Sequence, residues 1–197
     1  MTPTKIFPIL LAAGGSRSLP FPKALAPFGG KTAIEIALSN CEGLERPVVV
    51  LGARAAEIKK HLPAGVFCLV NRAWRRGQLS SLRAGLRHVP VKAAFLVYPV
   101  DLPMISPNII QRLAARFRRC NRRPCIVMPR FRKRLGHPAV FSADLRIELA
   151  HAKTAREVVH RDVGRIFTVP ARSDVLWMDF NTVKEYDRCL RLFRRQR

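Results

Sequence analysis

Acidic residues are scarce in this sequence. Of its 197 residues, 13 are Asp or Glu and 36 are Lys or Arg, which gives a formal net charge of +23. Such an excess favours polyanionic partners through attraction and counterion release, but it does not choose among them. Much of it lies in runs around apolar segments, namely RFRRCNRR, RFRKR and RLFRRQR. We interpret these runs as a solvated basic surface.

Aromatic residues suited to stacking on bases are also few, with two Trp and two Tyr. The basic runs are not organised as a stacking platform, and no known nucleic-acid-binding module is present. The sequence therefore argues against nucleic acid as the physiological ligand. We interpret Trp74 and Trp177 as packing residues, and the four helical histidines as surface or structural residues, namely His61, His88, His151 and His160.

Long apolar runs are absent. No segment approaches the roughly 20 residues that span a bilayer, and only Lys5 precedes the first short apolar stretch. We expect a soluble, cytoplasmic chain without a signal peptide.

Paired cysteines are absent as well. The five cysteines are an odd number, with no C-x-x-C pair and no histidine at a metal-ligand interval. We expect unpaired thiols in a reduced compartment.

What the sequence does contain is an alternation of short apolar runs with segments of helical period, which is typical of βαβ units on a mainly parallel sheet. With 48% hydrophobic residues and no repeat or linker, we expect one domain over 1–197, and a monomer. The expected strands are 5–12, 47–52, 65–70, 93–101, 124–129, 136–142 and 165–170. The expected helices are 31–40, 55–62, 78–89, 108–119, 144–150, 155–161 and 182–195. The most apolar strand, 93–101, should lie near the sheet centre.

The first strand runs into a glycine loop, ILLAAGGSRSLPFPK. Backbone N–H groups at Gly14 and Gly15 can approach an anion closely, and a loop ending in Lys23 could wrap a triphosphate. The loop matches neither G-x-x-x-x-G-K-[ST] nor G-x-G-x-x-G. An ordinary strand-to-helix connection is the alternative.

Asp101 directly follows the apolar strand FLVYPV. Ligands of open α/β sheets bind at the carboxyl ends of strands, and a carboxylate there suits a hard divalent cation that also binds phosphate. The alternative is a cap for the next helix.

Several segments occur in a fixed order with the glycine loop, namely NRAWRRGQLSSLRAGL, YPVDLP, LGHPAVFS, TAREVV and DFNTVKEYDR. Together they resemble the molybdenum cofactor cytidylyltransferases, within the molybdopterin-guanine dinucleotide synthase-like NTP transferase group. The match spans nearly the whole chain. It implies a three-layer α/β/α sandwich, a Rossmann-like fold of the nucleotide-diphospho-sugar transferase type. It also implies Mg²⁺-dependent transfer of CMP from CTP, or of another nucleotide from its NTP, to the phosphate of a molybdopterin-type cofactor.

The resemblance also assigns site residues. The nucleotide-binding set is Leu11, Ala12, Ala13, Gly14, Gly15, Ser16, Lys23, Asn71, Gly77, Ser80 and Ser81. Ala13 is the form associated with cytosine. Catalysis is implied for Lys23, Asp101 and Arg17, metal binding for Asp101, Asp179 and Asn181, and substrate binding for His137.

The sequence departs from the family pattern at three places. Ser18, Leu19 and Pro20 stand where the family has R-M-G. Asn181 replaces the usual second aspartate of the closing motif, and LGHP lacks the first glycine of G-x-x-G-H-P. Two alternatives follow: a transferase for another phosphorylated small molecule, or a nucleotide- and cofactor-binding protein with weakened catalysis that serves a molybdoenzyme.

Overall fold

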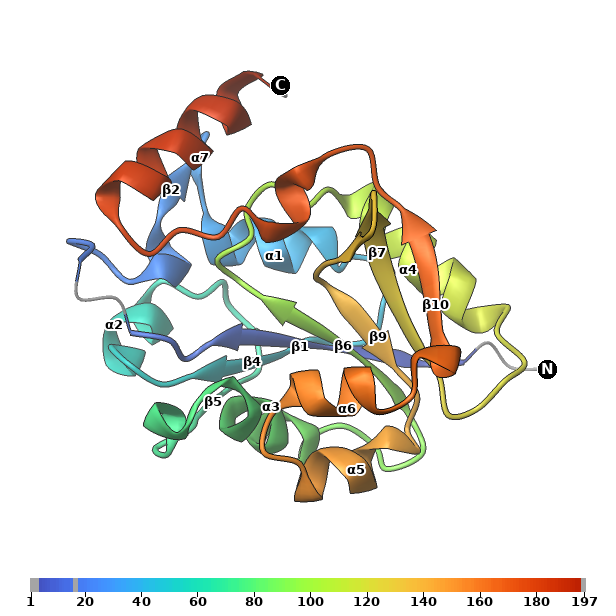
Figure 1. Cartoon of the computed structure of the whole chain (residues 1–197). Helices are drawn as coiled ribbons and strands as arrows, with labels where there is room; N and C mark the ends of the chain where they lie inside the picture. The colour runs from blue at the N-terminus through green and yellow to red at the C-terminus, as the bar shows by residue number, and fades with distance from the viewer. Residues whose placement is uncertain (1–3, 16–17, 196–197) are drawn as a thin grey trace.

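The computed structural model describes residues 4–15 and 18–195. Its centre is one large sheet (Figure 1). The strands of this sheet are β1 (Ile6–Ala12), β4 (Val48–Leu51), β5 (Cys68–Val70), β6 (Ala94–Pro99), β7 (Ile126–Phe131), β8 (Arg134–Leu135), β9 (Ala139–Phe141) and β10 (Ile166–Pro170). Their order is β10-β7-β9-β6-β1-β4-β5, with β8 paired to β7. A separate hairpin joins β2 (Pro27–Phe28) to β3 (Lys31–Thr32).

The sheet is mixed but mostly parallel. β1 runs parallel to both β4 and β6, β4 to β5, and β7 to β10, whereas β9 is antiparallel to β6 and β7. All six residues of β6 are buried, and β6 lies in the middle of the strand order. The expected central position of this strand is therefore confirmed.

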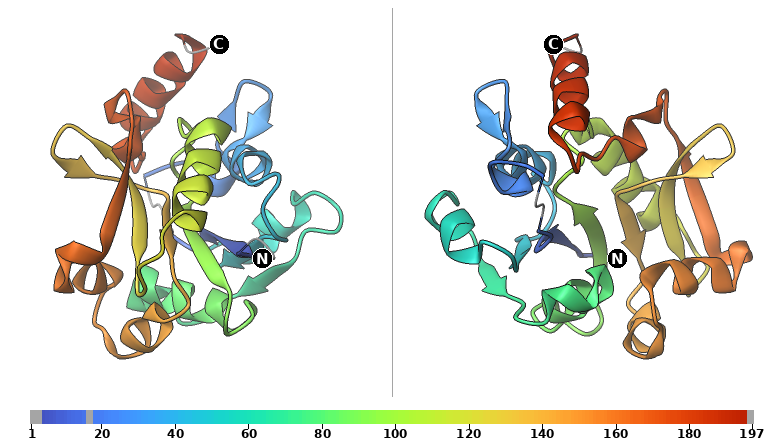
Figure 2. Two further views of the ribbon diagram at one scale, coloured as in Figure 1. Left: turned by 90° about the vertical axis from the view of Figure 1, so that its right-hand side faces the viewer. Right: turned by 60° about the vertical axis from the view of Figure 1, so that its left-hand side comes forward.

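Helices cover both faces of the sheet (Figures 1 and 2). They are α1 (Ala33–Asn40), α2 (Ala55–Lys60), α3 (Gln78–Leu86), α4 (Pro107–Arg118), α5 (Leu145–His151), α6 (Ala155–Arg161) and α7 (Val183–Arg195). The alternation of side chains along β1 separates two cores: Leu10 packs with α1, α2 and α4, whereas Ile9 packs with α3, α5 and α6. The expected three-layer architecture is confirmed.

A third apolar cluster lies outside these layers. Phe28 of the β2–β3 hairpin contacts the rings of Phe180, Tyr186 and Phe193, so that α7 packs against the hairpin (Figure 2). Leu19 is buried in the same cluster. Among the described residues, no helix has both the length and the apolar character that crossing a bilayer requires.

Most element boundaries differ from the expected ones by a few residues. The helix expected over 31–40 begins at Ala33 because Thr32 and Glu35 form a capping box: Thr32 N donates to Glu35 Oε2 at 2.7 Å, and Glu35 N donates to Thr32 Oγ1. The short hairpin over 27–32 was not expected from the sequence.

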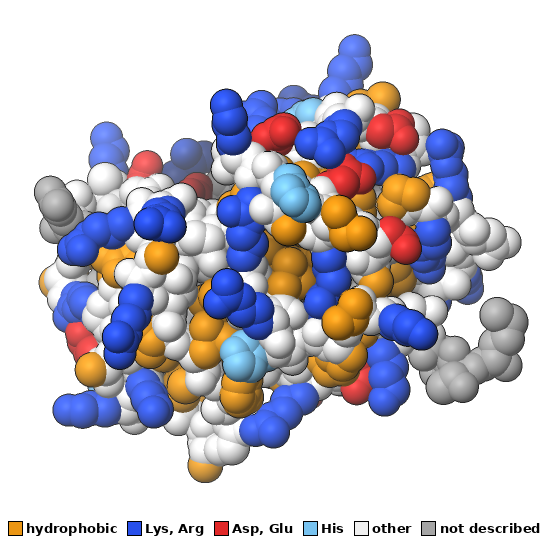
Figure 3. Space-filling model, turned by 90° about the horizontal axis from the view of Figure 1, so that it is seen from below, with side chains coloured by type: hydrophobic (Ala, Val, Ile, Leu, Met, Phe, Trp, Pro, Cys, Tyr) orange, Lys and Arg blue, Asp and Glu red, His pale blue; other side chains and the backbone are white. Residues whose placement is uncertain are grey.

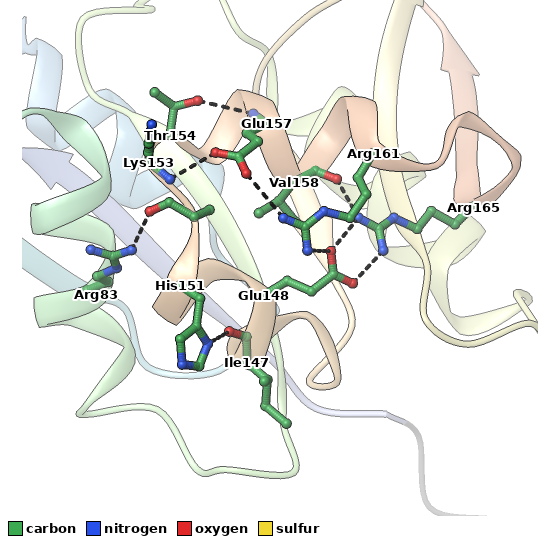
Figure 4. A network of polar contacts seen from close by, with 11 residues as sticks. Arg83, Ile147, Glu148, His151, Lys153, Thr154, Glu157, Val158, Arg161 and Arg165 are labelled. Atoms are coloured by element: carbon green, nitrogen blue, oxygen red, sulfur yellow. Dashed lines mark hydrogen bonds and ion pairs between the residues drawn. The ribbon is translucent and has the colours of Figure 1, made fainter.

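An ion-pair network fixes α5 and α6 to the following turn (Figure 4). The guanidinium of buried Arg165 donates to both carboxylate oxygens of Glu148, at 2.6 and 2.9 Å, and Arg161 adds a third contact at 3.2 Å. These hydrogen bonds from Arg165 hold the pKa of Glu148 below its usual value. On the other side, Arg83 of α3 donates to Leu149 O at 2.8 Å.

Candidate active site

A cleft opens at the carboxyl ends of β1 and β6. The two strands are parallel neighbours, with Leu11 in register with Pro99, so the chain segments that follow them leave the sheet side by side. The cleft has a volume of about 290 Å³. It is lined by Leu11, Ala12, Ala13, Gly14, Lys23, Ala24, Trp74, Arg75, Gly77, Gln78, Ser81, Pro99, Val100 and Asp101. The glycine loop and Asp101 therefore face one space, as the sequence predicts.

Close packing beneath the glycine loop depends on Gly52, a residue that sequence reasoning missed. A Cβ at Gly52 would lie 2.6 Å from Ala13 O and 2.7 Å from Trp74 Cβ. A Cβ at Gly15 would lie 3.2 Å from the Trp74 ring, whereas one at Gly14 would meet nothing within 4 Å. Gly14 thus faces open space. The sequence feature that could have identified Gly52 is its position directly after the apolar strand VVVL, where a glycine indicates close approach of another chain segment.

Lys23, Asp101 and Asn181 meet at the end of the cleft. The Lys23 ammonium donates to Asp101 Oδ2 at 3.0 Å and to Asn181 Oδ1 at 2.6 Å. The side chains of Lys23 and Asp101 are only 13% and 23% exposed, so their charges are partly shielded from water. Three distant segments of the chain therefore hold a positive charge between two oxygen atoms.

The C-terminal segment brings Asn181 and Asp179 to this place. Asn181 Nδ2 donates to Asp179 Oδ2 at 3.3 Å, and the backbone N–H of Asn181 donates to Glu185 Oε2 at 2.7 Å. Ser18 forms a parallel bridge with Thr182, so the segment lies beside the glycine loop. Asp179 itself is exposed.

Asn71 organises the turn before α3. Its amide nitrogen donates to Ser80 Oγ at 2.9 Å and to Ser81 Oγ at 3.0 Å, while its Oδ1 accepts from Ala73 N. Gly77 has a φ of 95°, a conformation that favours glycine. Gly77 and Ser81 line the cleft, whereas Asn71 does not line it and contacts it through its hydrogen bond to Ser81. Ser80 does not line the cleft either.

His137 lies between β8 and β9 and lines a second, adjoining cavity. Its Nδ1 is buried without a hydrogen-bond partner among the described residues. Burial lowers the pKa of His137, and the negative charge of Asp101 offsets part of that effect. The imidazole is therefore neutral at pH 7 and lies within electrostatic reach of Asp101.

Sequence reasoning also missed three residues of the cleft wall, Trp74, Arg75 and Gln78. Trp74 packs on the glycine loop, as expected of a packing residue, but it also lines the cleft. The guanidinium of Arg75 lies 4.9 Å from the centre of the Trp74 ring. All three belong to the segment NRAWRRGQ, which carried part of the family resemblance but did not single them out as cleft residues. Ser16 and Arg17 lie outside the described residues.

The geometry can be set beside known proteins. A model of the MobA-like NTP transferase domain matches residues 8–167. The chain belongs to this family. The MobA-like domain is a nucleotidyltransferase domain, and the matched range contains the glycine loop, Lys23 and Asp101. Asp179 and Asn181 lie beyond it.

Individual relatives agree on the fold. The nicotine blue oxidoreductase of Paenarthrobacter nicotinovorans is 30% identical over 199 residues, which covers 92% of this chain and 95% of that protein. Rv0371c from Mycobacterium tuberculosis is 24% identical with a TM-score of 0.82, covering 95% of this chain and 99% of its own. A nucleotidyl transferase from Methanothermobacter is 22% identical with a TM-score of 0.83, covering 98% and 99%. The MobA-like chain thus has the α/β fold of the nucleotide-diphospho-sugar transferases.

Proposed function

We propose that this protein transfers the CMP group of CTP, with a divalent cation, to the phosphate of a molybdopterin-type cofactor and releases pyrophosphate. The observation that carries the proposal is the Lys23 ammonium, held by Asp101 and Asn181 at the end of a cleft that the glycine loop lines. A fixed positive charge beside the backbone N–H groups of a glycine loop is what a triphosphate requires.

The reaction needs no protein nucleophile. A phosphate oxygen of the acceptor forms a bond to the α-phosphorus of CTP, and the bond from that phosphorus to the bridging oxygen breaks. Pyrophosphate leaves with the electron pair. Gly14 lines the cleft with open space in front of it, so its backbone can approach the phosphates. Lys23 and Arg75 neutralise the departing pyrophosphate.

The oxygen atoms around Lys23 suit a hard divalent cation, and we propose Mg²⁺. Asp101 and Asn181 would hold it, with Asp179 one hydrogen bond away. The described residues contain no group of three or more His, Cys, Asp or Glu that could hold a metal ion. Phosphate oxygens of the nucleotide and water would supply the remaining ligands of Mg²⁺. When bound, such a cation reduces repulsion between the two phosphate groups. A structure of Rv0371c has been obtained with manganese, which supports a cation in this fold.

CTP is proposed as the donor on the basis of Ala13. Ala13 is buried and lines the cleft, and its carbonyl oxygen accepts a hydrogen bond from Ala53 N at 3.0 Å. Alanine at this position is also the form that the resemblance to the cytidylyltransferases associates with cytosine. A synthetase of the same fold, 14% identical, has been crystallised with CTP.

A second candidate function is oxidoreduction. It is favoured by one observation: the relative named nicotine blue oxidoreductase matches almost the full length of both chains. The ring of Trp177 and the apolar lining of the second cavity would suit a flat conjugated substrate.

The test is release of pyrophosphate from CTP or GTP, with Mg²⁺ and with molybdopterin or a panel of other phosphorylated acceptors. We expect release with CTP and molybdopterin and none from Asp101→Ala. If every acceptor gives the same trace as Asp101→Ala while CTP still binds, the protein is a binding protein rather than a transferase. Oxidation of NADPH by a flat conjugated acceptor, without pyrophosphate release, would establish the second candidate instead.

A further inference from the structure

A second cavity continues the nucleotide cleft. It has a volume of about 640 Å³ and shares Leu11 and Gln78 with the first. Its walls are α3, α6 and the segment from β8 to β9, on the side of the sheet that Figure 3 shows, where hydrophobic side chains lie between Lys and Arg. A ligand in this cavity would therefore reach the phosphates of a nucleotide in the cleft.

The interior of this cavity is apolar. Leu82 of α3, Val97 of β6 and Phe141 of β9 are buried and line it, together with Met128. Phe141 stacks on the ring of Phe95 with ring centres 5.4 Å apart, which keeps the floor rigid. Such a lining suits the body of a small molecule with little hydrogen-bonding capacity.

The remaining walls are basic. Lys133 lies in the turn between β7 and β8, and Arg134 begins β8, whereas Arg156 and His160 lie one turn apart on α6. All four are exposed, and none of the described residues that line the cavity is Asp or Glu. The Arg134 guanidinium lies 4.3 Å from the centre of the Trp177 ring, which restricts its movement. The exposed part of the cavity thus has two pairs of basic side chains from two different elements.

The end toward the nucleotide cleft has a different chemistry. There, His137 offers a buried nitrogen without a hydrogen-bond partner among the described residues, near Asp101. A small rotation of the imidazole would bring this nitrogen to a phosphate oxygen in the cavity, and the bond would remove the cost of an unpaired buried polar atom. The cavity therefore has an anion position at this inner end and another between its basic walls, with apolar surface between them.

We propose that the acceptor bound in this cavity has two anionic ends joined by an apolar body. Its reacting phosphate lies against His137, and its second anionic group lies between Lys133 and Arg156. This inference rests on the proposed function for the identity of the inner end. A phosphorylated pterin with a second anionic group belongs to this class. A sugar phosphate with an uncharged, hydroxylated body does not.

The experiment uses two probes, naphthyl phosphate and its analogue with a sulfonate at the far end of the ring system. Their affinities are measured by calorimetry without nucleotide, at physiological salt. We expect the sulfonated probe to bind about tenfold more tightly to the wild type. The double variant Lys133→Gln/Arg156→Gln should remove that difference, whereas Arg118→Gln, an exposed arginine of α4 away from the cavity, should retain it.

A second variant tests the inner end. His137→Leu should weaken both probes by the same factor, because both share the phosphate. Equal affinity of the two probes for the wild type, or a difference that survives in the double variant, overturns the inference. The probe titrations contain no nucleotide, so they test the second cavity alone. CTP binding is measured in a separate titration. If CTP fails to bind there, the proposed function is contradicted, but the comparison of the two probes still stands.

Discussion

The ammonium group of Lys23 lies 3.0 Å from Asp101 Oδ2, although 78 positions separate the two residues in the sequence. Lys23 begins a short 3₁₀ turn after the glycine loop, and Asp101 follows the central strand β6. Asn181, from the last segment before α7, accepts from the same ammonium at 2.6 Å. Lys23 thus lies between the two oxygen atoms that we propose as ligands of the divalent cation.

This arrangement predicts opposite effects of Lys23→Gln on two ligands. Affinity for CTP should fall by about tenfold, because a cation that binds phosphate is lost. Affinity for Mn²⁺ alone should rise several-fold, since the ammonium no longer competes for Asp101. Calorimetry measures the first and Mn²⁺ electron paramagnetic resonance the second. If the variant binds Mn²⁺ no better than the wild type, Lys23 does not occupy a cation position.

Arg75 should contribute to nucleotide binding, although no sequence pattern distinguishes it from the neighbouring Arg76. Arg75→Gln should weaken CTP binding about fivefold, because its guanidinium lines the cleft. Arg76→Gln is the matched control, since Arg76 is adjacent and exposed but does not line the cleft. Calorimetric titration with CTP compares the affinities of the two variants. If both variants lose the same affinity for CTP, the effect comes from net charge in general and not from the position of Arg75.

Gly52 and Gly14 should respond differently to the same added methyl group. Gly52→Ala places a Cβ against Ala13 O and the Trp74 side chain, so we expect the free energy of unfolding to fall by about 2–3 kcal/mol. Gly14→Ala meets nothing within 4 Å and should change the free energy of unfolding by less than about 1 kcal/mol. Urea unfolding without nucleotide compares them. If the two variants had similar free energies of unfolding, the glycine loop would not pack on Gly52.

The ion pair of Glu148 with Arg165 should make stability depend on pH. The pKa of Glu148 is lowered in the folded protein, so its contribution is fully present above the unfolded value near 4.5 and is lost as the pH falls through the folded value. Glu148→Gln leaves the buried guanidinium of Arg165 without its charged partner and should cost about 3 kcal/mol at pH 7.

The same variant gives a clear readout over pH. The difference in unfolding free energy between the wild type and Glu148→Gln should narrow steadily below pH 4.5, because the wild-type carboxylate then becomes protonated. Glu42→Gln serves as the control, because Glu42 is exposed and forms no ion pair with any residue that the structure describes. It should show little difference at either pH. A constant difference for Glu148→Gln from pH 7 to pH 3 would contradict the assignment.

The sequence by itself determined the layers of the fold and part of the site. Alternating apolar strands and amphipathic helices specify a three-layer α/β arrangement, because each face of a mainly parallel sheet must be covered. The glycine loop and Asp101 were identifiable because both directly follow apolar strands, and strand ends of a parallel sheet share one edge. The local sequence pattern is therefore sufficient to predict the layers of the fold and these two segments of the site.

Only the tertiary structure decided which side chains share a space. Asn181 reaches Lys23 because α7 packs against the β2–β3 hairpin, and Gly52 matters because β4 passes beside the glycine loop. Arg75 lines the cleft while Arg76 does not. The basic pairs of the second cavity come from α6 and from the β7–β8 hairpin, which the mixed sheet brings to one place. No local sequence pattern predicts these long-range contacts, because they depend on how distant segments of the chain pack.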